Sequence, residues 1–256
     1  MKSWIVYKKE DAEKNIAFIS RLVAELAKYD IEAKLVFLGR EPKNETPSFV
    51  INRSRDFEVA QRLERKGVRV FNESRLVKIA NNKKKTFEFF DGVVDQMPLT
   101  KDYPCVMKSL DGHGGSEVFL IEKMEDEDQA RIAMHNKPYI RQEVCSDLGK
   151  DKRVYIVGGN VVGAVLRSAD NFKSNYSLGG KAKATTLDEK ELNIVEKITK
   201  KIYIDYAGID IIYNNGEPVF NEIEDPVGAR MLYENTDIDI VEIFVDYLVK
   251  EMTEIR

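Results

Sequence analysis

The chain has 256 residues, which is long enough to bury a substantial core and to form two compact units. Its 40 lysines and arginines nearly balance its 44 aspartates and glutamates, and the net charge of −4 argues against a broad basic surface for nucleic acid. The N-terminus lacks the apolar core of a signal peptide, and no stretch reaches the length of a membrane span. We therefore expect a cytoplasmic protein without a membrane partner.

The first eighty residues alternate between strand-like and helix-like segments. Strands are expected over residues 4–7, 34–38, 48–52 and 68–71, and helices over residues 11–29 and 56–66. Such alternation predicts a small parallel α/β unit. It contains no Gly-rich dinucleotide fingerprint, so we do not expect it to bind NAD in the usual way.

The rest of the chain has the pattern of an antiparallel α+β fold. Strands are expected over residues 104–108, 117–121 and 139–143, then a hairpin of 153–157 with 161–167, and helices over 188–203 and 238–252. Cys105 and Cys145 lie in apolar, strand-like segments without metal-ligand spacing, so we expect buried free thiols in a reducing compartment. A domain boundary is expected between residues 80 and 98, although no Ser/Gly linker marks it.

A Gly-rich segment, VMKSLDGHGGSEVF, follows the expected boundary. Lys108 ends a strand, and the loop after it contains Gly112, Gly114 and Gly115. Glycines let backbone N–H groups approach a phosphate, and a strand-anchored lysine supplies positive charge. The segment is not a Walker motif, and the alternative is a hairpin turn that binds nothing. His113, in the same loop, is either catalytic or incidental.

Further along, Arg167 ends the apolar strand VVGAVL and precedes the polar loop SNYSLGG, which contains Asn175. Arginine and asparagine in such a place suit polar recognition. Each of these positions is a weak signal by itself. Together they follow a fixed order along the chain: a lysine, a Gly-rich loop, an arginine, an asparagine and then the acids. This order is a more specific signal than any one of the positions.

Three acids near the C-terminus form the most informative pattern. Asp210 lies in AGIDII, and Glu222 and Glu224 lie in VFNEIED, so the run reads as two strands joined by an Asn-Gly turn. Glu222 and Glu224 share a face, and a loop of about five residues would place Asp210 opposite Glu222. Because a buried unpaired carboxylate is costly, such a cluster favours a hard cation such as Mg²⁺. The alternative is an exposed hairpin with solvated acids.

From about residue 50 to the end, the sequence resembles ATP-grasp enzymes, and most closely the RimK-like branch of glutamate, amino-acid and peptide ligases. The resemblance is carried by FVINRSRDFEVAQRLERKGVRVFN, NNKKKTFEFF, PCVMKSLDGHGG, YIRQEV, DKRVYIVGGNVVGAVLRSADNFKSNYSLGG, YAGIDII and FNEIEDPVGAR. It implies an ATP-grasp fold preceded by a small parallel α/β domain. The implied boundaries are residues 1–82 and 83–256, the latter with a lid over about 98–141 and a C-terminal subdomain over about 142–256.

The resemblance also implies a role for individual residues. The ATP-binding set is Lys83, Lys108, Gly112, Gly114 and Gly115 at the phosphates, Gln142, Glu143 and Val144 at the adenine, and Asp151 at the ribose. The set facing the phosphates and the reacting acyl group is Arg153, Arg167 and Asn175. The set binding two Mg²⁺ ions, with Mn²⁺ as a substitute, is Asp210, Glu222 and Glu224. Arg230 is the candidate for holding a substrate carboxylate. The alternatives are strand packing for Gln142 and Arg153, and a helix start or an interface for Arg230.

Three departures from the family pattern stand out. The metal motif reads Glu222-Ile223-Glu224 where the family has Glu-x-Asn, which keeps an oxygen ligand and adds a negative charge. Asn82 replaces an aspartate, and either residue can cap a helix. The segment DPVGARML replaces the commoner Pro-Gly ending and leaves the acceptor pocket undefined.

The implied activity is an ATP-dependent carboxylate–amine ligase that forms an amide through an acyl phosphate. Its partners would be ATP, an acid and an amine (an amino acid, a peptide or a protein terminus), with homo-oligomerisation also implied. One alternative is a kinase of small polyols, but a phosphorylated acceptor would need a basic pocket, and the N-terminal unit shows no clustered lysines or arginines. The other is a nucleotide-binding module without turnover, which would lack the metal ligands.

Overall fold

The computed structural model describes residues 1–169 and 181–254, so the predicted site residue Asn175 lies outside the described residues. The N-terminal unit is a parallel sheet in the order β2–β1–β3–β4, as the alternating pattern predicted. Its strands are β1 (Lys2–Tyr7), β2 (Glu32–Phe37), β3 (Phe49–Asn52) and β4 (Arg69–Phe71). Its helices are α1 (Lys9–Lys14), α2 (Ile16–Ala27) and α3 (Phe57–Glu64). The single helix expected over residues 11–29 is therefore two helices, which Asn15 separates.

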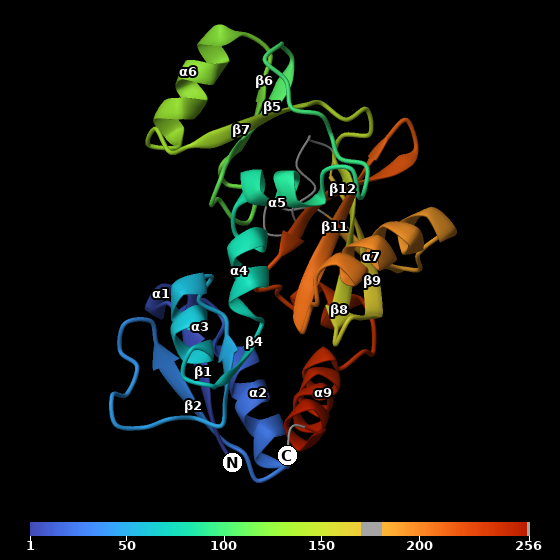
Figure 1. Ribbon diagram of the computed structural model, residues 1–256. Coiled ribbons are helices and arrows are strands. Elements are labelled where there is room, and N and C mark those ends of the chain that lie inside the picture. The colour runs from blue at the N-terminus through green and yellow to red at the C-terminus, as the bar shows by residue number, and fades with distance from the viewer. Residues whose placement is uncertain (170–180, 255–256) are drawn as a thin grey trace.

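Two helices that the sequence analysis did not predict connect this unit to the rest of the chain (Figure 1). They are α4 (Ser74–Ala80) and α5 (Lys83–Phe90). The Asn82 side chain accepts a hydrogen bond from the Lys85 N–H at 3.0 Å and so caps α5, which is the role proposed for this position. The cap fixes the start of α5 and with it the position of Lys83.

The remaining strands form two antiparallel sheets. The smaller sheet has the order β6–β5–β7 and carries one helix (Figure 1). Its elements are β5 (Cys105–Ser109), β6 (Val118–Ile121), α6 (Met124–Ala133) and β7 (Tyr139–Glu143). The larger sheet has the order β10–β9–β8–β11–β12. Its strands are β8 (Lys150–Val157), β9 (Asn160–Ser168), β10 (Lys181–Thr185), β11 (Tyr206–Asn214) and β12 (Glu217–Glu224). The helices of this part are α7 (Glu189–Lys201), α8 (Arg230–Asn235) and α9 (Ile240–Glu254).

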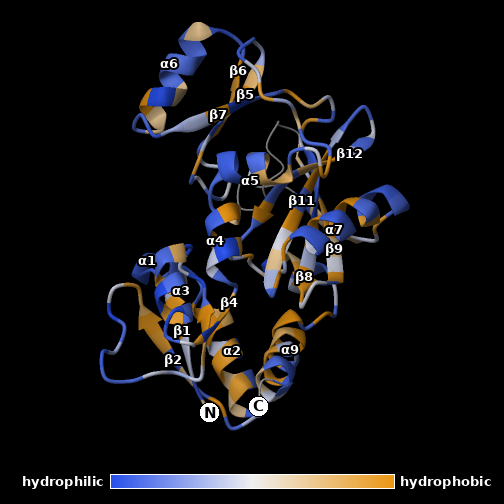
Figure 2. Ribbon diagram, viewed as in Figure 1, coloured by the Kyte–Doolittle hydropathy of each residue, from blue (hydrophilic) through white to orange (hydrophobic). Residues whose placement is uncertain are grey.

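Two apolar cores hold the larger sheet in place. On one face, residues of β8 and β11 pack with α4, the end of α5 and α7. The other core is shared with the N-terminal unit, because α9 lies beside α2 and their apolar faces meet (Figure 2). Within the described residues, no helix is both long and apolar enough to cross a bilayer. The shared core fixes the N-terminal unit against the sheet that carries the acidic residues.

The turn between β8 and β9 is held tightly against α9. Gly158 and Gly159 both have positive φ, at 54° and 76°. A Cβ atom built on Gly158 would lie 2.6 Å from the Tyr247 ring, whereas one built on Gly159 would be 3.6 Å from the nearest atom, on Tyr203. Tyr247 in turn donates a hydrogen bond to Asp205 at 2.5 Å. The positive φ favours glycine at both positions. At Gly158, glycine is also needed because a side chain would clash with Tyr247.

We expect Gly158→Ala to destabilise the protein by roughly 2–4 kcal/mol, because it adds a clash with the Tyr247 ring to the cost of positive φ. Gly159→Ala has only the backbone cost and should lose about 1 kcal/mol. Urea unfolding of the two variants measures the difference. Equal losses would show that the contact with Tyr247 does not restrain this turn.

Candidate active site

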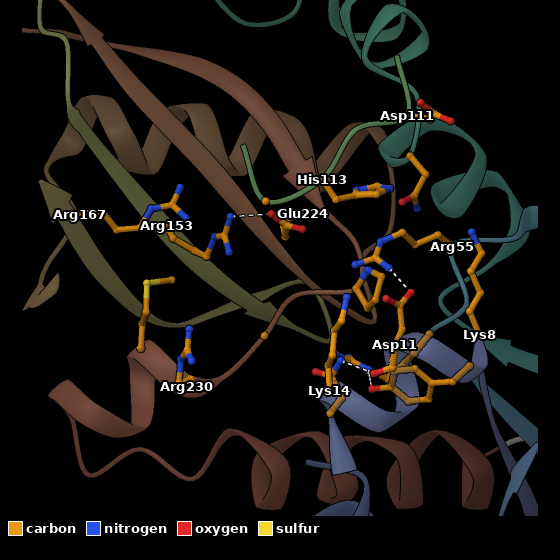
Figure 3. A pocket seen from close by; sticks show the side chains of 18 of the residues that line it. Lys8, Asp11, Lys14, Arg55, Asp111, His113, Arg153, Arg167, Glu224 and Arg230 are labelled. Carbon is orange, nitrogen blue, oxygen red and sulfur yellow. Dashed lines mark hydrogen bonds and ion pairs between the residues drawn. The ribbon is translucent and has the colours of Figure 1, made fainter. Parts of the chain in front are cut away.

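Two adjoining pockets lie where the three sheets meet. The larger has a volume of about 900 Å³ and opens between the N-terminal unit and the larger sheet (Figure 3). The smaller, of about 120 Å³, lies between the two antiparallel sheets. Gly114 and Arg167 line both pockets. The larger pocket is called the cavity below, and the smaller one the inner pocket.

The acidic hairpin is built as predicted, but not by the predicted loop. Asp210 pairs with Glu222 across β11 and β12, and Gly208 pairs with Glu224. The connecting turn has two residues, Asn215 and Gly216, so the loop of about five residues was wrong. A regular two-residue hairpin would pair Asp210 with Asn221. A bulge next to Asp210 inserts one extra residue in β12, which moves Glu222 and Glu224 onto the face of Asp210.

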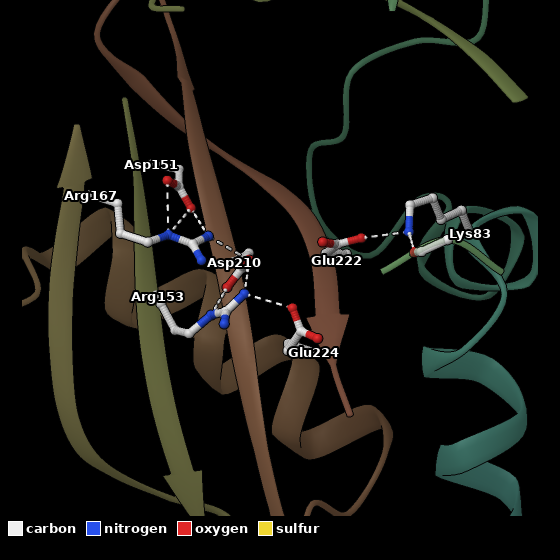
Figure 4. Close-up of polar contacts among 8 residues, drawn as sticks. Lys83, Asp151, Arg153, Arg167, Asp210, Glu222 and Glu224 are labelled. Carbon is white, nitrogen blue, oxygen red and sulfur yellow. Dashed lines mark hydrogen bonds and ion pairs between the residues drawn. The ribbon is translucent and has the colours of Figure 1, made fainter. Parts of the chain in front are cut away.

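The three carboxylates converge as the metal prediction requires. One oxygen from each of Asp210, Glu222 and Glu224 lies within 4.8 Å of the others (Figure 4). Asp210 and Glu222 line the inner pocket, whereas Glu224 lines the cavity. All three offer oxygen and none offers nitrogen or sulfur, and this donor set suits Mg²⁺ or Mn²⁺. The triad thus stands at the boundary between the two pockets.

Arginines from β8 and β9 neutralise Asp210. Arg153 donates to both Asp210 oxygens, at 2.7 and 2.6 Å, and to Glu224 at 2.7 Å. Arg167 donates to Asp210 at 2.7 Å and also pairs with Asp151 (Figure 4). Burial by itself would raise the pKa of Asp210, but the charges and hydrogen bonds of Arg153 and Arg167 lower it to about 2. Asp210 is therefore ionised throughout the physiological range.

On the other side of the triad, two lysines line the inner pocket. Lys83 lies 3.0 Å from a Glu222 oxygen and donates to the Gly112 carbonyl at 2.8 Å. Lys108 donates to the Asn221 side chain at 2.9 Å, and burial lowers the pKa of Lys108 to about 8. Asn221 is a site residue that the sequence analysis missed. Asn221 is the extra residue of the bulge. The spacing of residues in the sequence does not reveal a bulge, so it could not reveal this role of Asn221.

The predicted adenine-binding segment lines the inner pocket in part. Gln142 and Glu143 are among its lining residues, together with Cys145 and Leu148, which were not predicted for the site. The Gln142 side chain donates to the Met97 carbonyl at 2.9 Å and so also fixes the linker before β5. Both cysteines are free thiols, but Cys145 is only half-buried.

The remaining predicted residues divide between the pockets. Gly112, Gly115 and Asp151 line the inner pocket, and Arg230 begins α8 and lines the cavity. Arg153, for which strand packing was the alternative, also lines the cavity. His113 faces the cavity too, and burial, helped by the nearby charge of Arg55, lowers its pKa to about 4. His113 is therefore neutral at neutral pH.

The cavity corrects the prediction that the N-terminal unit has no clustered basic residues. Lys8, Lys14, Arg53 and Arg55 all line it (Figure 3 shows Lys8, Lys14 and Arg55). They belong to two segments, near residues 8–14 and 53–55, that are adjacent only in the folded chain, because β1 and β3 are neighbours in the sheet. The argument against a phosphorylated acceptor, which rested on a missing basic pocket, is therefore wrong.

Comparison with known proteins agrees with this arrangement. The model of the RimK-like ATP-grasp domain matches residues 57–248. An uncharacterized protein of Mycoplasma pneumoniae is 31% identical, over 90% of this chain and 86% of its own. N-acetylaspartylglutamate synthase A of Homo sapiens is 31% identical over 83% of this chain, which spans 59% of the human protein.

The fold has solved counterparts. The crystal structure of a RimK domain ATP-grasp protein from Sphaerobacter thermophilus superposes with a TM-score of 0.74 at 15% identity, over 97% of this chain and all of the other. The chain therefore belongs to the RimK-like ATP-grasp family.

Proposed function

We propose that the inner pocket binds ATP and that the cavity binds an acid and an amine, which the protein joins through an acyl phosphate. The observation that carries this proposal is the position of the triad. Asp210 and Glu222 face the inner pocket with Lys83 and Lys108, and Glu224 faces the arginine-lined cavity. Phosphoryl transfer between the pockets would take place across these carboxylates.

In the first step, a substrate carboxylate oxygen attacks the γ-phosphorus of ATP, and the bond from that phosphorus to the ADP oxygen breaks. Divalent ions held by Asp210, Glu222 and Glu224 would neutralise the phosphate oxygens. Lys83 and Lys108 bind the phosphates from the inner pocket, and Arg167, which lines both pockets, reaches the transferred group.

In the second step, the amine nitrogen attacks the acyl carbon. The bond from that carbon to the phosphate-bearing oxygen breaks, giving an amide, inorganic phosphate and a proton. Arg153 and Arg230 line the cavity on the acyl side, where they orient the acid. Gly112, Gly114 and Gly115 cover the phosphates. Of the residues predicted to hold the nucleoside, Gln142, Glu143 and Asp151 line the inner pocket, whereas Val144 lines neither pocket.

The direct test is incubation of the protein with Mg·ATP and pools of carboxylic acids and amines, following ADP release and product mass. We expect ADP release that needs both an acid and an amine, and a product lighter than the sum of the two by one water. A phosphorylated acid that accumulates with its amine present would instead identify a kinase. ATP binding without turnover in any pool would contradict the proposal.

The metal motif gives a second prediction. Glu222→Gln should lower kcat on the order of 10²–10³-fold, because it removes a charge from the phosphoryl-transfer site.

Glu224→Asn restores the residue common in the family, so kcat should stay within a few-fold while the Mg²⁺ concentration for half-maximal rate rises. Glu217→Gln, an exposed acid of the same strand, is the control. An unchanged Mg²⁺ requirement in Glu224→Asn would show that Glu224 is not a ligand.

The pKa of Lys108 gives a third prediction. Since that pKa is lowered to about 8, the ammonium is present at pH 7 and is lost as the pH rises through 8. The affinity for a non-hydrolysable ATP analogue should therefore fall on the order of tenfold between about pH 7 and 9.5. Lys108→Arg, which stays charged, should bind equally well across this range. Calorimetry measures both, and the control Lys84→Arg, on the exposed face of α5, should behave as the wild type. The same pH dependence in Lys108→Arg would assign the titration to another group.

A further inference from the structure

The residue after Glu224 is a buried carboxylate that is held from two sides. Asp225 is only 3% exposed, and it lines neither the cavity nor the inner pocket. Its Oδ1 accepts a hydrogen bond from the Asn72 side chain at 2.9 Å, and its Oδ2 accepts one from the Asn81 side chain at 3.0 Å. The positive charge of Arg53 also acts on it. Burying a carboxylate is costly unless it is hydrogen-bonded and paired, so these contacts are needed to keep Asp225 where it lies.

Asn72 joins this carboxylate to the N-terminal unit and to the start of β11. It lies directly after β4 and is also 3% exposed. Its Nδ2 donates to Asp225 and, at 2.7 Å, to the Tyr206 carbonyl. Its Oδ1 accepts from the backbone N–H groups of Asp205 and Tyr206, both at 2.9 Å. The amide uses two donors and two lone pairs, which fixes its orientation, and it ties together the two strands that carry the triad.

Asn81 joins the same carboxylate to the segment that carries Lys83. It directly follows α4, and its Nδ2 also donates to the Val77 carbonyl at 3.2 Å. The next residue, Asn82, caps α5, and Lys83 is the first residue of α5. Lys83 lies 3.0 Å from a Glu222 oxygen and lines the inner pocket. A shift of Asn81 would therefore move a lysine that contacts the triad and faces the proposed phosphate site.

We propose that Asp225 is a positioning residue of the phosphoryl-transfer site. It holds the chain after Glu224 on one side and the start of α5 on the other, and so sets where the metal ligands lie relative to Lys83. It acts through these residues, because it lines neither pocket itself. Removing a group that orients a metal ligand typically weakens metal binding by about 10- to 100-fold. This role rests on the metal and nucleotide binding proposed above.

The test measures Mn²⁺ binding, which needs no turnover. Electron paramagnetic resonance gives the Mn²⁺ affinity at a saturating concentration of a non-hydrolysable ATP analogue, and calorimetry gives the affinity for the analogue. Asp225→Ala removes both acceptor oxygens, so the Mn²⁺ affinity should fall by about tenfold or more, and the affinity for the analogue should fall several-fold. A wild-type Mn²⁺ affinity in this variant would overturn the positioning role.

Asp205→Asn is the matched control. Asp205 is also a buried carboxylate, 1% exposed, and its side chain accepts hydrogen bonds from Arg69 of β4 and Tyr247 of α9. It lines neither pocket. Urea unfolding should show a loss of stability in both Asp205→Asn and Asp225→Ala, whereas the Mn²⁺ affinity should fall only in Asp225→Ala. An equal loss of Mn²⁺ affinity in the two variants would assign the effect to a general loosening of the structure and contradict positioning.

An exchange of donor and acceptor tests the contact even if Asp225→Ala does not fold. Asp225→Asn keeps the size of the side chain but places an N–H group opposite that of Asn81, so the affinities for Mn²⁺ and the analogue should fall several-fold. Adding Asn81→Asp restores a donor–acceptor pair and the net charge, so both affinities should return to within about threefold of the wild type. A double variant that binds no better than Asp225→Asn alone would overturn the positioning role.

The outcomes separate this role from the function beneath it. A wild-type protein that binds no Mn²⁺ with the analogue would overturn the metal site, and the role of Asp225 with it. The expected losses of affinity, in a protein that shows no ADP release with any acid or amine, would support the role of Asp225 and overturn the ligase proposal alone.

Discussion

Three carboxylates within 4.8 Å of one another repel strongly in a largely buried place, and much of the surrounding structure compensates for that repulsion. Arg153 and Arg167 reach Asp210 from β8 and β9, and Lys83 reaches Glu222 from the first turn of α5. A divalent ion could take the place of any of these cations beside the carboxylates, and the cation could then bind a phosphate. These ion pairs reduce the repulsion among the three carboxylates.

The sheets are arranged so that the three carboxylates face two pockets. The larger sheet supplies the acids and the arginines, and the smaller sheet supplies Lys108 and the wall of the inner pocket. The N-terminal unit, fixed by the packing of α2 on α9, closes the cavity with cations at the two ends of α1 and in the segment after β3. Reactants bound on the two sides would then meet beside the triad. Two pockets that adjoin at the triad would hold the reactants close together and correctly oriented, which accounts for a large part of the rate enhancement in such reactions.

The sequence predicted the triad, the lysines and the helix cap at Asn82 because those signals are local or follow a strong motif. It gave the wrong connection between Asp210 and Glu222, because a five-residue loop and a two-residue turn with a bulge bring the same residues together. It also missed the cavity wall. Lys8 and Arg53 are far apart along the chain and meet only through the pairing of β1 with β3, which no periodicity reveals.

If the bulged hairpin is a metal site that operates with a nucleotide, it should bind Mn²⁺ together with an ATP analogue. Electron paramagnetic resonance would count the Mn²⁺ ions bound in the presence of a non-hydrolysable ATP analogue. We expect two ions per chain with the analogue, and their loss in the double variant Asp210→Asn and Glu222→Gln. Unchanged Mn²⁺ binding in that variant would contradict it.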